Sequence, residues 1–500
     1  MPDGTTRTTG STTTPAQDRH GGTARLAVGV VCAGGFTVSL TQTLVIPLQG
    51  DLPRLLGASP ADAGWVVTIT LLAAAVAMPI AGRLGDLLGK QRVLLASAAL
   101  LLLGSVVSGL STSLAPMLAG RLLQGLAMGF IPVGIALLRE VSPPELTHTA
   151  VAAMSATLGV GGAIGLPLAA WATQTFDWHA VFWLAALLAA ALLVAVAVLV
   201  PRPPARAAGR LDVVGAVLLA VGLVGVLLAV SQGHEWGWTS PRTLTSVCVG
   251  VAVLLVWGVH QVRSDDPLVD LRASAQRPVL LTNVAAVAIG FGMMAQSIVV
   301  PQLLQLPAAT GFGLDQSILA AGLWMAPGGL VMMAFAPVSS RLMSALGPRS
   351  TLMIGAGVLA VGYLVAFAMA HEPWQLLIAS SIASAGVGIG YAAMPTLIMG
   401  AVPLSQAASA VGLNALMRSV GTTTAAAVMT TVLASNLVAG PGGVHATEGA
   451  YRACFLIGAA AALLGVALTA LVPRRTSAPD HVQAAPTPAE ALEAEAPTAG

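Results

Sequence analysis

The sequence predicts an all-α integral membrane protein with 14 transmembrane helices, arranged as two six-helix bundles and an inserted two-helix hairpin. Composition is the first of three observations that predict this fold class. Hydrophobic residues make up 56% of the 500 residues, charged residues only 8%, and the mean hydropathy is +0.86. A water-soluble protein carries about 25% charged residues, so lipid must surround most of this chain.

A series of apolar runs from residue 25 to residue 472 is the second observation. Each run is close to the roughly 20 residues that a helix needs to cross a bilayer. An even number of spans places both termini on the same side of the membrane. The predicted spans are residues 25–47, 63–81, 93–111, 115–138, 149–172, 179–200, 212–231, 243–262, 279–304, 317–338, 350–370, 375–400, 406–436 and 451–472.

An internal repeat is the third observation. Gln42–Pro47 recurs as Gln296–Pro301, and further along the chain Gly89 recurs as Gly347. Both copies begin on the same side of the membrane, which is typical of parallel repeats related by an axis along the membrane normal. We therefore expect an N-terminal six-helix half at 25–200, a central two-helix hairpin with its linkers at 201–278, and a C-terminal six-helix half at 279–472.

Polar segments flank the apolar region. Residues 1–24 are rich in Thr, Gly and Ser, and residues 473–500 in Ala, Pro and Glu, so we expect both to be disordered. The first segment is too long and polar for a cleavable signal peptide. The three cysteines lie inside apolar runs and no glycine-rich ATP-binding loop is present. We therefore expect no disulfide, metal, cofactor, nucleic-acid partner or enzymatic activity.

Basic residues are concentrated on one side of the predicted helices. The positive-inside rule assigns that side to the cytoplasm, so we expect both termini there, in a multi-pass protein of the plasma membrane. The opposite loops carry only Arg54, Arg242 and Arg452. The basic side carries Arg83, Lys90, Arg92, Arg139, Arg202, Arg206, Arg210, Arg263, Arg272, Arg277, Arg341, Arg349, Arg474 and Arg475.

The stretch Gly82–Arg92 forms a polar turn between the second and third predicted spans. Its glycines permit a close approach of two helix ends and a positive φ at the turn. The stretch resembles the signature of the major facilitator superfamily in this loop, Gly-x-Leu-x-Asp-x-x-Gly-(Lys/Arg). An ordinary basic cytoplasmic loop is the alternative. We predict a conformational latch made by Gly82, Arg83, Asp86, Gly89 and Arg139, in which Asp86 pairs with Arg139 and also favours a neighbouring helix N-terminus.

Two further motifs resemble the 14-helix drug:proton antiporter family of this superfamily. Arg121–Gly125 matches its Arg-x-x-Gln-Gly signature, and Gly161–Pro167 is similar to its antiporter signature. Gly161, Gly165 and Pro167 are therefore expected to act in helix packing. The sequence departs from the family twice. The pattern Gly-Pro-x-x-Gly-Gly is not kept after Gly165, and Thr41 stands where the family carries an aspartate in the first span.

Charged residues near the predicted spans are candidates for proton coupling or substrate binding. Arg121 lies about six residues into its span, where a charge is costly and marks a functional site. Snorkelling of its side chain to the headgroups is the alternative. Gln124 belongs to the same motif. Asp51 and Glu140 are the carboxylate candidates, both near helix ends.

Polar and methionine side chains predict a substrate cavity. Gln42, its neighbour Thr41 and the repeat counterpart Gln296 lie on the first helix of each half, where the superfamily lines its cavity. We expect the two amides to face one another across that cavity. Hydrogen bonds that pack helices are the alternative. Met294 belongs to a methionine-rich region of the second half, which suits either a promiscuous cavity or plain core filling.

The resemblance implies a secondary active exporter of amphipathic small molecules, of the multidrug efflux type, driven by proton antiport. Its partners would be a small-molecule substrate, protons and the lipid bilayer, and a monomer is the working assumption. Export of one anionic metabolite or antibiotic, with Arg121 as the counter-charge, is an alternative. A membrane sensor or assembly protein that moves no substrate is an alternative from another class.

Overall fold

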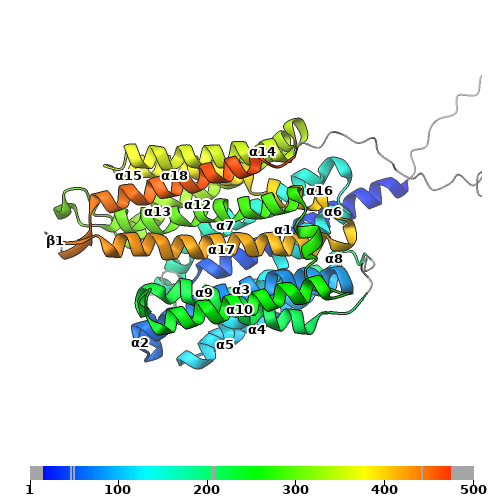
Figure 1. The fold of residues 1–500 in the computed structure, drawn as a ribbon, viewed down its shortest axis with the longest axis horizontal. Coiled ribbons are helices and arrows are strands. Elements are labelled where there is room, and N and C mark those ends of the chain that lie inside the picture. Colours follow the sequence, from blue (N-terminus) through cyan, green and yellow to red (C-terminus); the bar gives the residue numbers. More distant parts are fainter. Residues whose placement is uncertain are drawn as a thin grey trace, which may run out of the picture.

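Long apolar helices run side by side along the longest axis of the molecule in a computed structural model of the chain (Figure 1). The structure describes residues 15–45, 48, 51–203, 207, 209–440 and 443–473. Residues 1–14 and 474–500, in the segments predicted to be disordered, lie outside the described residues, as does Pro47. The first helix begins at Pro15, before the predicted start at residue 25.

The first eight helices form what we call the N-terminal group. Proline and serine start the third of them, because Ser59 accepts a hydrogen bond from the backbone N–H of Asp62 and Pro60 occupies the first turn. The elements of this group are α1 (Pro15–Thr43), α2 (Leu52–Leu56), α3 (Pro60–Leu88), α4 (Lys90–Gly109), α5 (Leu114–Leu126), the 3-10 turn η2 (Ala127–Gly129), α6 (Phe130–Val141), α7 (Pro144–Thr175) and α8 (Ala180–Leu199).

The remaining helices comprise a central pair and a C-terminal group that starts with α12. The central elements are α9 (Val213–Trp236), α10 (Pro241–Arg263) and the short α11 (Leu271–Ser274). The C-terminal group consists of α12 (Arg277–Gln305), η3 (Ala308–Thr310), α13 (Ile318–Ala334), α14 (Ala336–Ala368), α15 (Pro373–Gly390), α16 (Ala393–Ala401), η4 (Leu404–Gln406), α17 (Ala407–Ser435), the antiparallel strands β1 (Leu437–Gly440) and β2 (Gly443–Ala446), and α18 (Glu448–Ala470).

Eleven of the described helical stretches are long and apolar enough to span a membrane, or 12 if the bent helix α7 counts as one span. The predicted number of 14 is not confirmed by this measure and stays a prediction. One of the 11 is the 50-residue stretch Leu319–Ala368, whose backbone leaves helical geometry at Gly347. The 29-residue helix α17 is not among the 11 and contains the buried Arg418.

The internal repeat is visible in the backbone. Gly89 separates α3 from α4 with φ 93° and ψ 135°, and its repeat counterpart Gly347 interrupts α14 with φ 80° and ψ 161°. An L-amino acid with a side chain rarely adopts such a positive φ. Glycine therefore allows the same abrupt reversal at equivalent points of both groups.

The N-terminal and C-terminal groups meet mainly where α17 packs against α3 and α13 packs against α7, and α14 against α7 and α17 against α6 add to this contact. The inserted helix α9 lies against both α3 and α17. Its residues Leu219 and Leu223 share one apolar cluster with Leu72 of α3 and Leu413 of α17. The inserted helices are thus packed onto the junction between the two groups.

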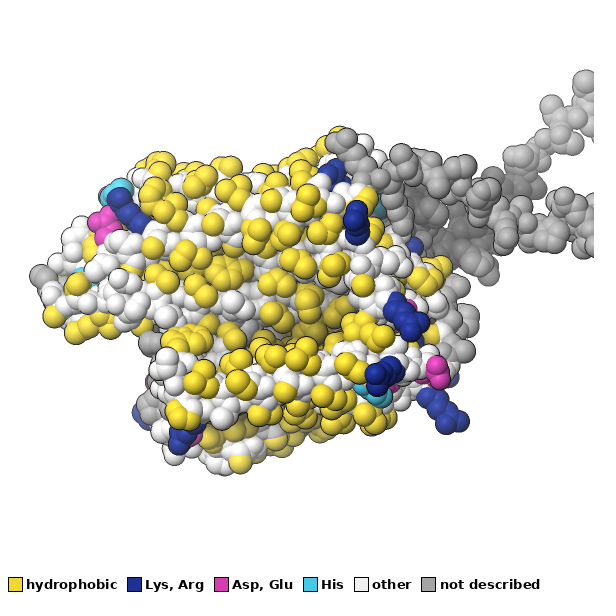
Figure 2. Space-filling model, in the orientation of Figure 1, with side chains coloured by type: hydrophobic (Ala, Val, Ile, Leu, Met, Phe, Trp, Pro, Cys, Tyr) yellow, Lys and Arg dark blue, Asp and Glu magenta, His cyan; other side chains and the backbone are white. Residues whose placement is uncertain are grey.

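The two ends of the helix bundle differ in charge. Figure 2 shows Lys and Arg side chains gathered mainly at one end, which is also where the described parts of α1 begin and α18 end (Figure 1). We call this the basic end. The β1–β2 strands lie at the opposite end, the hairpin end. Between the two ends the visible surface is largely hydrophobic, as lipid contact requires, and it is hollowed between the upper and lower helices of the view.

Candidate functional site

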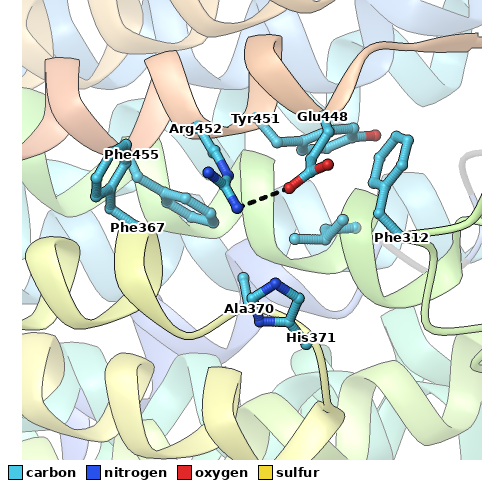
Figure 3. Close-up of a pocket in the computed structure, with 9 residues that line it drawn as sticks. Phe312, Phe367, Ala370, His371, Glu448, Tyr451, Arg452 and Phe455 are labelled. Carbon is cyan, nitrogen blue, oxygen red and sulfur yellow. Dashed lines mark ion pairs between the residues drawn. The ribbon is translucent and has the colours of Figure 1, made fainter.

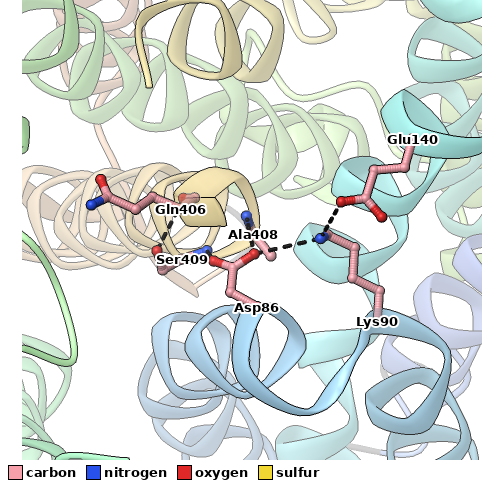
Figure 4. A network of polar contacts seen from close by, with 6 residues as sticks. All are labelled: Asp86, Lys90, Glu140, Gln406, Ala408 and Ser409. Atoms are coloured by element: carbon pink, nitrogen blue, oxygen red, sulfur yellow. Dashed lines mark hydrogen bonds and ion pairs between the residues drawn. The ribbon is translucent and has the colours of Figure 1, made fainter. Parts of the chain in front are cut away.

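Asp86 joins the two helical groups at the basic end (Figure 4). It lies in the last turn of α3, is 0% exposed, and accepts hydrogen bonds from the backbone N–H groups of Ala408 (3.2 Å) and Ser409 (2.9 Å) in the first turn of α17. The first N–H groups of a helix have no partner inside it and carry partial positive charge. The carboxylate thus caps a helix of the other group, which is the helix N-terminus contact that the sequence predicted.

The ion pair of Asp86 differs from the prediction. The structure pairs Asp86 with Lys90 at 3.5 Å rather than with Arg139, and Lys90 Nζ lies 2.7 Å from a carboxylate oxygen of Glu140. All three side chains are at most 3% exposed. Lys90 thus lies between two carboxylates, and the N-terminus of α17 adds positive partial charge on the Asp86 side. Glu140, predicted as a separate coupling carboxylate, therefore belongs to this cluster.

Arg139 nevertheless contributes to the same closure. Its Nη1 donates a hydrogen bond to the backbone carbonyl of Met399 in α16, so it also connects the two groups. At the same end, the hydroxyls of Thr149 in α7 and Ser340 in α14 lie 2.8 Å apart. The sequence prediction paired Asp86 with Arg139 and missed Lys90. The signal that could have found Lys90 is its position four residues after Asp86 in the same motif.

Gly82 allows the close approach of α3 and α17. A Cβ atom at this position would collide with the backbone carbonyl of Ala408. The next helical residue of the motif, Arg83, is 8% exposed, and its Nη2 lies 3.9 Å from a carboxylate oxygen of Asp266 in the linker after α10. The glycine-rich motif thus brings its backbone against α17 and its arginine against the inserted segment.

The inserted segment is anchored at the same end by a buried carboxylate. Asp212 caps α9 by accepting from the backbone N–H of Gly215 (2.7 Å), and its oxygens also lie 3.0 and 3.1 Å from His260 Nε2 and 2.7 Å from Gln261 Nε2. Burial opposes ionisation, but these hydrogen bonds outweigh it and hold the pKa of Asp212 below its usual range. The ends of α9 and α10 are therefore tied together.

Arg121 is buried among neutral acceptors in the N-terminal group. It is 1% exposed, its Nε donates to the carbonyl of Val66 (3.1 Å), and its Nη1 donates to Gln124 Oε1 (2.7 Å). Gln124 Nε2 in turn donates to Ser105 (3.0 Å). The side chain does not reach the surface, so the snorkelling alternative is not supported. Asp51 is different, because its side chain is 62% exposed beside Arg54, so it lacks the burial that a coupling carboxylate needs.

The predicted cavity residues do not converge on one point. Gln296 Nε2 lies 3.4 Å from the carbonyl of Ser380 in α15, so it turns toward its own group rather than toward Gln42. The Nε2 atom of Gln42 is buried without a hydrogen-bond partner among the described residues. Thr41 is 2% exposed and donates to the carbonyl of Thr37 one turn earlier, and Met294 is half-buried on α12. The expectation that the two amides face one another is wrong in this structure.

Gly161 and Gly165 lie where α7 crosses α1. A Cβ atom at Gly161 would come within 2.6 Å of Ser39, and one at Gly165 would collide with Thr43. Pro167 follows inside α7, which bends by 42° between Leu146–Gly162 and Pro167–Thr173. Close backbone contact and a bend are what the predicted packing role requires.

A small pocket opens at the hairpin end of the C-terminal group (Figure 3). Arg452 and Glu448 of α18 form an ion pair of 2.8 Å at this pocket, and the guanidinium lies 5.9 Å from the ring centre of Phe367. Both charged side chains are about half exposed. The pocket is therefore lined by a partly exposed ion pair and by aromatic rings.

Sequence reasoning missed a polar cluster in the middle of the C-terminal group. Arg418 of α17 donates to Asn414 Oδ1 (3.1 Å), whose Nδ2 donates to Asn283 Oδ1 (3.0 Å) in α12. The guanidinium carbon lies 4.4 Å from the ring centre of Tyr391. The signal that could have found this cluster is one arginine in the otherwise uncharged span predicted at residues 406–436.

Two groups of apolar helices, closed on each other at one end by buried charges, have the architecture of a secondary transporter. A family model described as Major Facilitator Superfamily matches residues 31–426 and 282–497. The chain therefore belongs to the Major Facilitator Superfamily, as its motifs predicted.

Named relatives and solved structures agree with this family. The chain is 28% identical over 74% of its length to the "Multidrug resistance protein B homolog" of Mycobacterium tuberculosis, of which it covers 70%. It is 27% identical over 65% of its length to the "Uncharacterized MFS-type transporter YhcA" of Bacillus subtilis, of which it covers only 60%. The fold matches the proton:xylose symporter XylE with a TM-score of 0.64 at 12% identity, over 90% of this chain and 96% of that one.

Proposed function

We propose that this protein exports amphipathic small molecules across the plasma membrane, driven by proton antiport, with its basic end in the cytoplasm. Alternating access would come from rocking of the N-terminal and C-terminal groups about a site between them. The positive-inside rule supports the orientation, because Lys90, Arg92 and Arg139 lie at the basic end.

The observation that carries this proposal is the contact of Asp86 with the first turn of α17. A transporter needs a closure that is strong enough to seal one side and can still be released. Hydrogen bonds from Ala408 and Ser409 to a buried carboxylate hold the basic end closed without a covalent bond, so this contact can be broken and remade. This contact supports a state closed toward the cytoplasm, from which substrate would be released on the other side.

Protonation provides a way to release this closure. A proton on Asp86 would remove the charge that attracts the helix N-terminus and Lys90, and a proton on Glu140 would weaken the other side of the same cluster. Arg121, with its neutral partners Val66 and Gln124, would supply a fixed positive charge in the N-terminal group. Proton binding and conformational change would thus act on one set of contacts.

The proposed substrate class rests on the named relatives and on the side chains near the contact between the two groups. One relative carries the name of a multidrug resistance protein. The buried amide of Gln42 has no partner among the described residues, so a polar group of a substrate could pair with it. Met78, Met128 and Ala415 form an apolar cluster between α3, η2 and α17, and flexible thioethers adapt to ligands of different shape.

Transport in proteoliposomes tests the proposal. The purified protein is reconstituted, a pH gradient is imposed, and the accumulation of rhodamine 123 and fluorescein is followed beside proton flux reported by an internal pH dye. We expect accumulation of dye that is coupled to proton movement and abolished by an uncoupler. Accumulation that survives collapse of the gradient would exclude proton antiport. A well-folded protein that moves neither dye nor any compound of a wider toxic panel would instead support the sensor or assembly alternative.

A further inference from the structure

A buried arginine in the middle of α17 has no role in the latch. Arg418 lies about three turns, roughly 16 Å, from the start of α17 and is 8% exposed. A charge at such a depth is costly in a membrane and marks a functional position. The buried positive charge of Arg418 therefore calls for a negative group that balances it.

The described neighbours of Arg418 are all neutral. Asn414 accepts one hydrogen bond from Nη1, Asn283 pairs with Asn414, and the ring of Tyr391 covers the guanidinium at 4.4 Å. The guanidinium offers five N–H donors. Its Nε and Nη2 atoms have no hydrogen-bond partner among the described residues, yet they do not belong to the fully enclosed unpaired atoms. Donors therefore remain on the accessible side of the group.

No carboxylate of the surrounding helices can serve as the counter-ion. The sequences of α12, α15, α16 and α17 contain neither Asp nor Glu. The other helices against α17 carry acidic residues only near their ends, and the buried Asp86 is held by the first turn of α17, far from Arg418. These end positions are Asp62 and Asp86 in α3, Glu140 in α6, Glu235 in α9 and Glu448 in α18.

Arg418 stands beside the junction between the two groups. The next residue, Ser419, donates to the sulfur of Met78 in α3 at 3.7 Å. A Cβ atom at Gly412 of α17 would lie 2.5 Å from the carbonyl oxygen of Met78, so the helices touch here. Movement of α3 away from α17 would open the surroundings of Arg418 to the space between the groups, next to the methionines.

We propose that Arg418, supported by Asn414, Asn283 and Tyr391, binds the anionic head group of the exported molecule. The inference rests on the proposed export and deepens it, because it names amphipathic anions as a substrate class. A carboxylate or sulfonate would accept two parallel hydrogen bonds from the planar guanidinium. The apolar body of the same molecule would lie against Met78 and its neighbours.

Two dyes of the same xanthene scaffold test this inference in proteoliposomes. Fluorescein is anionic and rhodamine 123 is cationic, so a group that recognises negative charge affects only the first. We expect Arg418→Gln to lower fluorescein transport by roughly 30-fold or more, with rhodamine 123 transport little changed. Arg418→Lys keeps a positive charge but loses the planar fork, so it should raise the KM for fluorescein alone. Arg242→Gln, at an exposed arginine of α10, is the matched control.

The outcomes separate this inference from the proposed function. Wild-type protein that moves rhodamine 123 but not fluorescein would refute the anion site and leave export standing. Well-folded wild-type protein that moves neither dye nor any compound of the wider toxic panel would refute both. Equal losses of both dyes in a folded Arg418→Gln protein would make Arg418 a structural residue. Should the glutamine variant fail to fold, the Arg418→Lys protein decides, and an equal KM change for both dyes would overturn the inference.

Discussion

Replacement of Asp86 by asparagine weakens the contact that closes the basic end. Asparagine keeps one acceptor oxygen, so of the two hydrogen bonds from Ala408 and Ser409 about one survives, and the ion pair with Lys90 is lost. A hydrogen bond to a charged group contributes about 1.5–3 kcal/mol, and the attraction between a negative charge and a helix N-terminus about 0.3–1 kcal/mol. We therefore expect the closed state to lose about 2–3 kcal/mol, a roughly 30- to 150-fold shift toward the open state.

Spin-label distances measure this shift directly. In a cysteine-free background, labels at Arg92 beyond the start of α4 and at Leu404 in η4 report the separation of the two groups at the basic end, because both side chains are exposed. Asp86→Asn should add a population at longer distance and lower dye transport, with expression near normal. The shift should follow the loss of charge, so raising the pH should not restore the closed state of the variant.

Two control variants sharpen the test. Asp62→Asn makes the same chemical change at the other end of α3, where Asp62 is exposed. Ser344→Ala changes the repeat counterpart of Asp86, whose hydroxyl donates only to the carbonyl of Ser340 within its own helix. Both should leave the distances unchanged. A distance distribution and transport rate in Asp86→Asn that equal those of the wild type would refute the latch.

Three further predictions concern the interior of the molecule. Arg121→Lys should lower transport by roughly tenfold or more, because lysine cannot donate to Val66 and Gln124 in the same fork geometry. A fully active lysine variant would show that only the positive charge at this position is needed. Gln42→Leu should change the range of transported dyes without lowering thermal stability, because the amide nitrogen has no partner to lose; an unchanged range with a lower melting temperature would assign Gln42 to helix packing. Asp212→Asn should lower the free energy of unfolding by about 1–3 kcal/mol at neutral pH, measured by thermal unfolding. Because the folded-state pKa of Asp212 is depressed, its contribution is present above the unfolded pKa of about 3.9 and is lost as the pH falls through the folded value; a wild-type advantage that already vanishes near pH 6 would contradict this assignment.

Much of the fold follows from the sequence because hydropathy reports the solvent of each segment. Runs of apolar residues identified the long helices, and the local pair Ser59 and Pro60 starts α3. The spacing of Gly89 and Gly347 predicted equivalent turns, and both adopt the positive φ that glycine permits. These features depend on local chemistry, so one stretch of chain contains the information that determines them.

The partners of the functional side chains were decided by the tertiary structure. Asp86 binds backbone groups 322 and 323 residues further along the chain, and Gln296 turns into its own group. In a membrane protein, the helix faces that meet lipid and those that meet other helices are similarly apolar, so the hydrophobic pattern that identifies a buried face in water carries little information here. Sequence alone therefore located the helices and the latch motif. Only packing showed that the N-terminus of α17 holds Asp86 and that Arg418 has no acidic neighbour among the described residues.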